Sequence, residues 1–96
     1  MPYAYILYSQ SIDRFYIGST ADNLEDRLSK HLKIEYGNKA FTSKASDWVV
    51  FWSVCTDNIL HAKRIERKLK QMKSRVYLQN LVKYPELVTK IFNETL

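Results

Sequence analysis

The sequence has one cysteine, Cys55, and only two glycines and two prolines among its 96 residues. A single cysteine excludes an intramolecular disulfide framework and any cysteine-rich zinc site. The scarcity of glycine and proline excludes a collagen-like or loop-dominated chain. No apolar run approaches the roughly 18 residues of a membrane span, and the start of the chain lacks the basic segment of a secretory signal. We therefore expect a soluble protein of the reducing cytoplasm, with no membrane partner.

The composition is that of a small basic globular protein. Hydrophobic residues make up 46% of the chain and aromatic residues 14%, which excludes an intrinsically disordered chain. Fifteen Lys and Arg against ten Asp and Glu give a formal net charge of +5. With no linker or repeat in the sequence, we expect residues 1–96 to form a single domain. The positive charge with interleaved aromatic residues favours a nucleic acid as the partner.

The first half of the chain predicts strands on either side of one helix. Residues 3–8 and 14–19 are rich in aromatic and β-branched side chains, and the short polar link between them is typical of an antiparallel hairpin. Asp22 can cap a helix in which Leu24, Leu28 and Leu32 share one face. Residues 48–55 are apolar at both alternate positions, a pattern that predicts a strand covered on both faces.

The second half predicts three helices. After Asn58, an apolar stripe recurs at helical spacing through Ala62, Ile65, Leu69 and Met72. Ser74 can cap a short helix that runs to Val82, and Pro85 suits the first turn of a last one. The order is β-β-α-β-α-α-α. The predicted fold class is α+β, with a small three-stranded antiparallel sheet flanked by helices.

The helix that follows Asn58 carries a single acid, Glu66, among many basic residues. One interpretation is a solvated basic helix on which Glu66 pairs with Lys70 one turn later, which adds little stability. The other is a divalent-metal ligand, because Mg²⁺ is often held by one or two carboxylates with phosphate and water. The basic residues predict a salt-dependent phosphate-binding patch; they are Lys63, Arg64, Arg67, Lys68, Lys70, Lys73 and Arg75.

Two further pairs of residues are candidates for a site. Arg27 and His31 are one turn apart on the first predicted helix, where they are either site residues or an exposed arginine and a partly buried histidine. Tyr5 and Tyr16 are expected on one face of the hairpin, as site residues or as an aromatic cross-strand pair. Gly18 is expected at the end of the second strand, where a side chain would obstruct a close approach.

In combination these motifs resemble the GIY-YIG nuclease domain of some homing endonucleases and of the N-terminal part of the bacterial excinuclease C subunit. The resemblance covers residues 3–82 and is strongest to short stand-alone bacterial members. Its motifs in this sequence are Tyr-Ala-Tyr at residues 3–5, Tyr-Ile-Gly at residues 16–18, Arg27 with His31, Ala62 with Glu66 and Lys70, and a late Asn80. The first motif departs from the family pattern, which has Gly-Ile-Tyr at this place.

The resemblance implies a metal-dependent DNA endonuclease. Glu66 would hold Mg²⁺ or Mn²⁺, and Arg27 would contact the scissile phosphate. Tyr5 would position or deprotonate the attacking water, for which a phenol with a pKa near ~10 needs positive charge nearby. Tyr16 and His31 would complete the hydrogen bonds. The residues expected to bind nucleic acid are Lys63, Arg64, Arg67, Lys70, Lys73 and Asn80.

Because no targeting domain is visible, sequence specificity is expected to be low, or to come from a homodimer or a protein partner. A role in DNA repair or recombination is the expected context. The alternative is a binding module that keeps the fold and binds nucleic acid without cutting it. A third interpretation, a partner-binding adaptor, depends only on Phe41 and Trp48 beside an expected loop.

Overall fold

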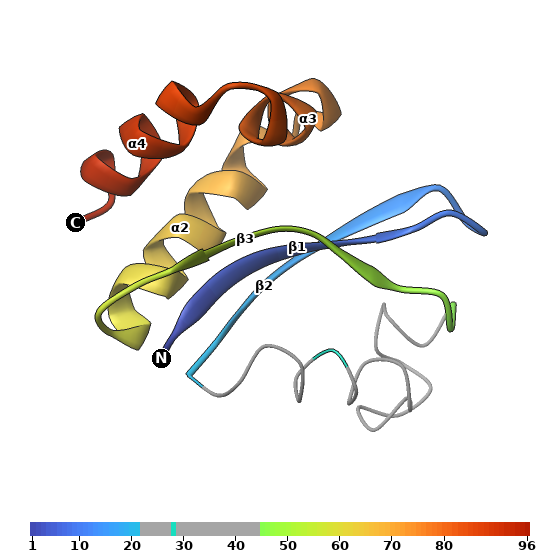
Figure 1. Ribbon diagram of the computed structural model, residues 1–96, viewed down its shortest axis with the longest axis horizontal. Coiled ribbons are helices and arrows are strands. Elements are labelled where there is room, and N and C mark those ends of the chain that lie inside the picture. Colours follow the sequence, from blue (N-terminus) through green and yellow to red (C-terminus); the bar gives the residue numbers. More distant parts are fainter. Residues whose placement is uncertain (22–27, 29–44) are drawn as a thin grey trace.

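The computed structural model describes residues 1–21, 28 and 45–96, and Figure 1 shows how their strands and helices are arranged. Three antiparallel strands form one sheet in the order β2-β1-β3. They are β1 (Tyr3–Ser9), β2 (Arg14–Thr20) and β3 (Val49–Cys55). Three helices follow, α2 (Ile59–Met72), α3 (Arg75–Lys83) and α4 (Pro85–Glu94). The predicted α+β class is confirmed, whereas the predicted helix that begins at Asp22 lies outside the described residues except for Leu28.

The helices begin where the sequence predicted, and Asn58 proves to be a cap as Ser74 was predicted to be. The Asn58 side chain accepts a 2.9 Å hydrogen bond from the His61 amide, and the Ser74 hydroxyl accepts one of 3.1 Å from Tyr77. Each cap satisfies one of the amides that a helix leaves unpaired in its first turn. Pro85 occupies the start of α4, where its missing amide costs no helical hydrogen bond. The predictions of all three helices are confirmed.

The hairpin register assigns each residue of β1 and β2 to one face of the sheet. Tyr5 pairs with Gly18 and Leu7 pairs with Tyr16, and because directly opposite residues share a face, Tyr5 and Tyr16 lie on the same side. This confirms their expected placement. The neighbouring residues Ala4, Ile6, Ile17 and Ser19 therefore face the other side, which α2 covers.

The main core lies between the sheet and the helices. Ala4 and Ile6 of β1 pack against the buried stripe of α2, and α3 and α4 close the cluster; the helical residues buried here are Ala62, Ile65, Leu69, Leu78, Leu81 and Ile91. In Figure 1 the three helices lie on the same side of the sheet. A smaller cluster of Tyr5, Leu7 and Trp48, with Leu28 packed against it, lies on the other face. The two faces of β1 are thus both buried.

Strand β3 corrects one expectation. The sequence predicted a strand covered on both faces, but Val49 is 56% and Val50 38% exposed. The reason is the sheet order: β3 is an edge strand, whereas β1 occupies the centre and has four consecutive buried residues. Trp48, just before β3, is only 2% exposed. It is therefore a core residue and cannot serve as the exposed partner contact that the adaptor interpretation requires.

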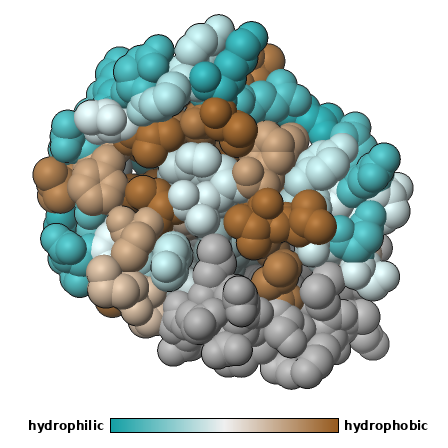
Figure 2. Space-filling view, in the orientation of Figure 1, coloured by the Kyte–Doolittle hydropathy of each residue, from teal (hydrophilic) through white to brown (hydrophobic). Residues whose placement is uncertain are grey.

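Some apolar residues of the helices are exposed, and one of them, Met72, belonged to the predicted apolar stripe. Met72, Val76 and Val82 are 39%, 64% and 55% exposed. On the face of the molecule that Figure 2 shows, apolar side chains (brown) are interrupted by polar ones (white and teal). Among the described residues, none of the helices is long and apolar enough to cross a lipid bilayer.

Candidate nuclease site

Glu66 lies in the middle of α2, on the side of the helix that faces β2. Its Oε1 accepts a 2.5 Å hydrogen bond from the Ser19 hydroxyl of β2, and its Oε2 accepts one of 2.5 Å from the Lys70 ammonium. The Glu66 side chain is 22% exposed and that of Lys70 is 54% exposed. The carboxylate is therefore held at the junction of sheet and helix, with one oxygen bound to a neutral donor and the other to a cation.

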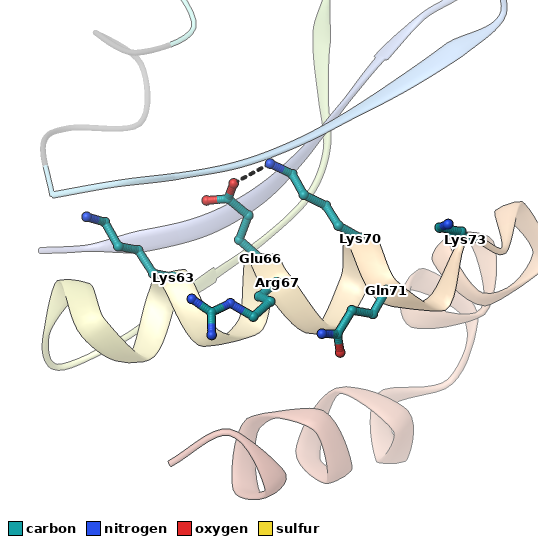
Figure 3. A pocket seen from close by; sticks show the side chains of 6 residues that line it. All are labelled: Lys63, Glu66, Arg67, Lys70, Gln71 and Lys73. Carbon is teal, nitrogen blue, oxygen red and sulfur yellow. Dashed lines mark hydrogen bonds and ion pairs between the residues drawn. The ribbon is translucent and has the colours of Figure 1, made fainter.

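A pocket of about 500 Å³ lies along this part of α2. Its described lining carries four basic side chains and one carboxylate; the residues are Lys63, Glu66, Arg67, Lys70, Gln71 and Lys73. Figure 3 shows Lys63, Glu66 and Lys70 projecting on one side of the helix, and Arg67 and Gln71 on the other. Five of the six lining side chains can donate hydrogen bonds, which suits a phosphate group, whose oxygens only accept them.

Tyr5 lies against Gly18 on the opposite face of the sheet. A β-carbon on Gly18 would be 2.6 Å from the Tyr5 Oη and 2.7 Å from its Cζ. The close approach expected at Gly18 is therefore made by the Tyr5 side chain. Gly18 lies within β2, two residues before its end, and the prediction that it ends the strand is wrong. The absence of a side chain at residue 18 lets the phenol reach across the edge strand.

Tyr16 is more accessible than Tyr5. Tyr5 is 1% exposed, whereas Tyr16 is only partly buried. The Tyr16 ring makes an edge contact with Trp48, with ring centroids 6.5 Å apart. Trp48 is itself buried in the same cluster as Tyr5, so this indole fixes the environment of both phenols.

The Tyr5 phenol and the Glu66 carboxylate meet the same edge strand at consecutive residues. Tyr5 contacts Gly18, and Glu66 is bound by Ser19. Because consecutive strand residues point to opposite faces, the two groups approach β2 from opposite sides of the sheet. The end of β2 is therefore the segment that links the tyrosine face to the acidic group.

The tip of the hairpin is tied to the start of α3. The Arg75 guanidinium forms an ion pair with Asp13 and lies over the Phe15 ring, 5.1 Å from its centroid. The Tyr8 hydroxyl donates a 2.6 Å hydrogen bond to the same carboxylate. Hydrogen bonds from Arg75 and then from Tyr8 hold the pKa of Asp13 below its ordinary value of 3.8, and Asp13 raises the pKa of Tyr8. This contact connects the end of the hairpin to the first residue of α3.

The structure brings only some of the predicted site residues together. Four residues of the predicted patch, Lys63, Arg67, Lys70 and Lys73, line the pocket with Glu66. Arg64 is not in that lining; it lines an adjoining pocket with Lys68 and Glu94, which shares Arg67 and Gln71 with the first. Asn80 lies in α3, where its carbonyl accepts the Tyr84 amide at 2.8 Å, and it is not part of the described lining of the Glu66 pocket. Arg27 and His31 lie outside the described residues.

His61, in the first turn of α2, lies away from the basic surface of this helix. It is 4% exposed, and its Nε2 is 3.0 Å from both the Phe92 carbonyl and the Thr95 hydroxyl. Its ring also makes an edge contact with that of Phe92. His61 therefore joins α2 to α4 in the interior and is not part of the exposed basic surface.

Sequence reasoning missed two residues near the site. The first is Ser19, whose partner Glu66 is 47 residues away in the chain; its place beside Gly18 on the helix-facing side of β2 was the available signal. The second is Arg14, at the start of β2, which lines a neighbouring pocket that shares Lys70 and Lys73 with the first. The basic surface therefore extends from α2 towards the hairpin.

The donor set around Glu66 is compatible with a single-carboxylate metal site. Within residues 1–21, 28 and 45–96, no group of three histidine, cysteine or acidic side chains is close enough to hold a metal ion. A protein cage is therefore absent from this part of the chain. One carboxylate is nevertheless sufficient where substrate phosphate and water provide the remaining Mg²⁺ ligands.

No curated protein and no solved structure matches this chain. A family model described as the GIY-YIG catalytic domain matches residues 1–80, which include all three strands, α2 and the residues that line the Glu66 pocket. This confirms the resemblance found in the sequence motifs. The family consists of endonucleases and implies DNA as the substrate. The chain belongs to the GIY-YIG family, and its fold is of the nuclease type.

Proposed function

We propose that this protein is a divalent-metal-dependent endonuclease that hydrolyses phosphodiester bonds in DNA. The observation that carries the proposal is the Glu66 carboxylate, half enclosed between Ser19 and Lys70 in a basic pocket of a GIY-YIG domain. The pocket offers donors for phosphate, and its single acid offers a ligand for a hard cation. Both are needed for metal-assisted phosphoryl chemistry.

Glu66 would hold Mg²⁺ or Mn²⁺ through its carboxylate. GIY-YIG nucleases generally use divalent metals. Such an ion, when bound, polarises a phosphoryl oxygen and stabilises the departing 3′ oxygen. The Ser19 hydroxyl would hold the Glu66 side chain in place for a bound metal, because the hydroxyl is hydrogen-bonded to one of the two carboxylate oxygens.

The basic residues of the pocket would bind the DNA backbone. Lys63, Arg67 and Lys73 line one pocket along α2 and its C-terminal cap, and they bind phosphate without reading the base sequence. Arg14 extends the same surface into the neighbouring pocket. Contacts of this kind support low sequence specificity.

We assign activation of the water to a tyrosine hydroxyl. Because the tyrosines and Glu66 approach the edge strand β2 from opposite faces of the sheet, the scissile phosphate would have to lie at the edge of β2. The sequence assigned this role to Tyr5, but the near-complete burial of Tyr5 and the partial exposure of Tyr16 favour Tyr16 as the phenol that contacts substrate or water. In this proposal Tyr5 supports Tyr16 through packing and hydrogen bonding and does not itself contact the substrate. The resemblance assigns contact with the scissile phosphate to Arg27, and the remaining hydrogen bonds to His31.

The proposal also includes the domain organisation, the partners and the cellular role of the protein. Ile91 of α4 packs in the core cluster with β1 and α2, which supports a single domain over residues 1–96. One site of this kind cuts one strand, so cleavage of both strands requires a homodimer or two successive cuts. A protein partner would supply specificity. A role in cytoplasmic DNA repair or recombination stays a prediction from the sequence.

A plasmid-nicking assay tests the proposal directly. Supercoiled plasmid is incubated with the protein in Mg²⁺ or in EDTA, and the relaxed form is quantified. We expect relaxation in Mg²⁺ and none in EDTA. The alternative is a non-catalytic module, for which the basic pocket alone would suffice; salt-sensitive DNA binding with no nicking in Mg²⁺ or Mn²⁺ would support that alternative instead.

A further inference from the structure

The two oxygens of Glu66 have partners of different charge. Oε1 is bound by the neutral Ser19 hydroxyl, and Oε2 is bound by the Lys70 ammonium. A hydroxyl can remain on a carboxylate that also coordinates a cation, because it adds no positive charge. An ammonium cannot share the same oxygen with a dication at low cost, because the two positive charges repel each other. Since the hydroxyl can stay and the ammonium cannot, a metal ion would bind Oε2, the oxygen to which Lys70 is now hydrogen-bonded.

Lys70 is able to leave this oxygen easily. Its side chain is 54% exposed, and it pairs with Glu66 from the next turn of the same helix. Exposed pairs of this kind are weak, because solvent screens the attraction and the long side chain loses rotamer freedom. Lys70 also lines both the Glu66 pocket and the neighbouring pocket that contains Arg14. A released ammonium therefore remains beside the surface that phosphate would occupy.

We propose that Lys70 and a divalent metal ion exchange on Oε2 of Glu66. Lys70 neutralises the carboxylate while the metal is absent. Metal binding displaces the ammonium, which then pairs with a phosphate of the nucleic acid. The inference rests on the proposed function, since it assigns the metal to Glu66, and it adds a coupling: the contribution of Lys70 to DNA affinity depends on the metal.

Metal affinity without DNA is the first readout. Binding of Mn²⁺ is measured from the electron paramagnetic resonance signal of the free ion, with wild type, Lys70→Met, Lys63→Met and Glu66→Gln. Lys63 is the matched control, because it lines the same pocket, one turn before Glu66, and carries the same charge. We expect Lys70→Met to bind Mn²⁺ about threefold or more tightly than wild type, Lys63→Met to change affinity less, and Glu66→Gln to lose binding.

DNA affinity is the second readout. Anisotropy of a labelled oligonucleotide is measured in EDTA and in Ca²⁺, a dication with the same preference for oxygen ligands. We expect Lys70→Met to weaken DNA binding in Ca²⁺ and to have little effect in EDTA. Lys63→Met should weaken binding equally in both, because its charge is available throughout.

The outcomes separate the inference from the proposed function. If Glu66→Gln binds Mn²⁺ as wild type does, Glu66 is no metal ligand, and the metal site of the proposed function is wrong as well. If Glu66→Gln loses binding but Lys70→Met binds no more tightly than Lys63→Met, the exchange alone is wrong. Absence of Mn²⁺ binding to Lys70→Met at millimolar concentration overturns the exchange, as does an equal effect of Lys70→Met on DNA binding in EDTA and Ca²⁺.

Discussion

Ser19 of β2 donates a 2.5 Å hydrogen bond to Oε1 of Glu66 in α2, and this contact joins residues 47 positions apart. It connects the edge strand of the sheet to the only acidic residue of the described pocket lining. Ser19 follows Gly18, which Tyr5 overlies on the opposite face. The position of the carboxylate is therefore determined by the same strand that positions the phenol.

Removing the Ser19 hydroxyl should slow cleavage more than it destabilises the fold. We expect Ser19→Ala to cost about 1 kcal/mol of unfolding free energy or less and to lower the cleavage rate about tenfold, the lower end of the effect of losing a hydrogen bond to a metal ligand. Ser19→Thr keeps the hydroxyl and should restore most of the rate. Ser53→Ala, at an exposed position of β3, is the control. Equal rates for wild type and Ser19→Ala would show that this hydrogen bond does not position Glu66 for the reaction.

A side chain at residue 18 should displace Tyr5. The β-carbon of Gly18→Ala would lie 2.6 Å from the Tyr5 Oη, and Tyr5 is buried, so we expect a loss of about 1–3 kcal/mol in unfolding free energy. Chemical denaturation measures this loss. In a Tyr5→Leu background the same substitution should cost clearly less, because the ring is gone. An equal cost in both backgrounds would assign the effect to backbone conformation.

The two tyrosines should differ in catalysis. Tyr16→Phe removes the hydroxyl of the more exposed tyrosine and should lower the cleavage rate by about two orders of magnitude or more, the scale of a lost general base. Tyr5→Phe keeps the ring over Gly18 and should have a smaller effect. Single-turnover rates, measured with all of the DNA bound, compare cleavage by the two variants without any effect of the substitutions on DNA binding. A larger loss for Tyr5→Phe would return the role to Tyr5, as the sequence motifs indicate.

The contact between the hairpin and α3 should make stability depend on pH. Hydrogen bonds from Arg75 and Tyr8 lower the pKa of Asp13 in the folded protein, so this carboxylate stabilises the fold above its ordinary pKa of 3.8 and loses that contribution as the pH falls through the lower folded value. Wild type should exceed Asp13→Asn in stability at pH 7, and the difference should shrink towards pH 3. Thermal unfolding across this range measures it. In an Arg75→Gln background the difference at pH 7 should be smaller, and an unchanged difference would show that Arg75 does not stabilise the Asp13 carboxylate.

The sequence predicted the elements of this fold better than their positions in it. Asn58, Ser74 and Pro85 are local signals, and the helices begin where these residues predicted. Strand β3 was mispredicted as doubly covered because an apolar pattern does not say whether a strand is central or at an edge. Its exposed Val49 and Val50 follow from the order β2-β1-β3, which depends on contacts distant in sequence.

In the candidate site, too, contacts within one element were predicted and contacts between elements were not. Spacing along one helix predicted the pair of Glu66 and Lys70, because residues four apart share a helix face. The role of Ser19 was missed, since its partner is in another element and only its place beside Gly18 pointed to it. Tyr5 and Tyr16 were placed on one face by strand alternation, but their different burial depends on Trp48 and the packing around it. The sequence-based predictions for Arg27 and His31 stay predictions.

The most direct measurement is the Mg²⁺-dependent nicking rate of Glu66→Gln. The variant is nearly isosteric, and a neutral amide binds a hard dication far more weakly than a carboxylate does. Glu94→Gln removes an acid that pairs with Lys68 at 3.9 Å and serves as the control. We expect Glu66→Gln to keep its melting temperature and its DNA binding without metal, and to lose cleavage. Cleavage by Glu66→Gln at the wild-type rate would contradict the assignment of this site as the nuclease centre.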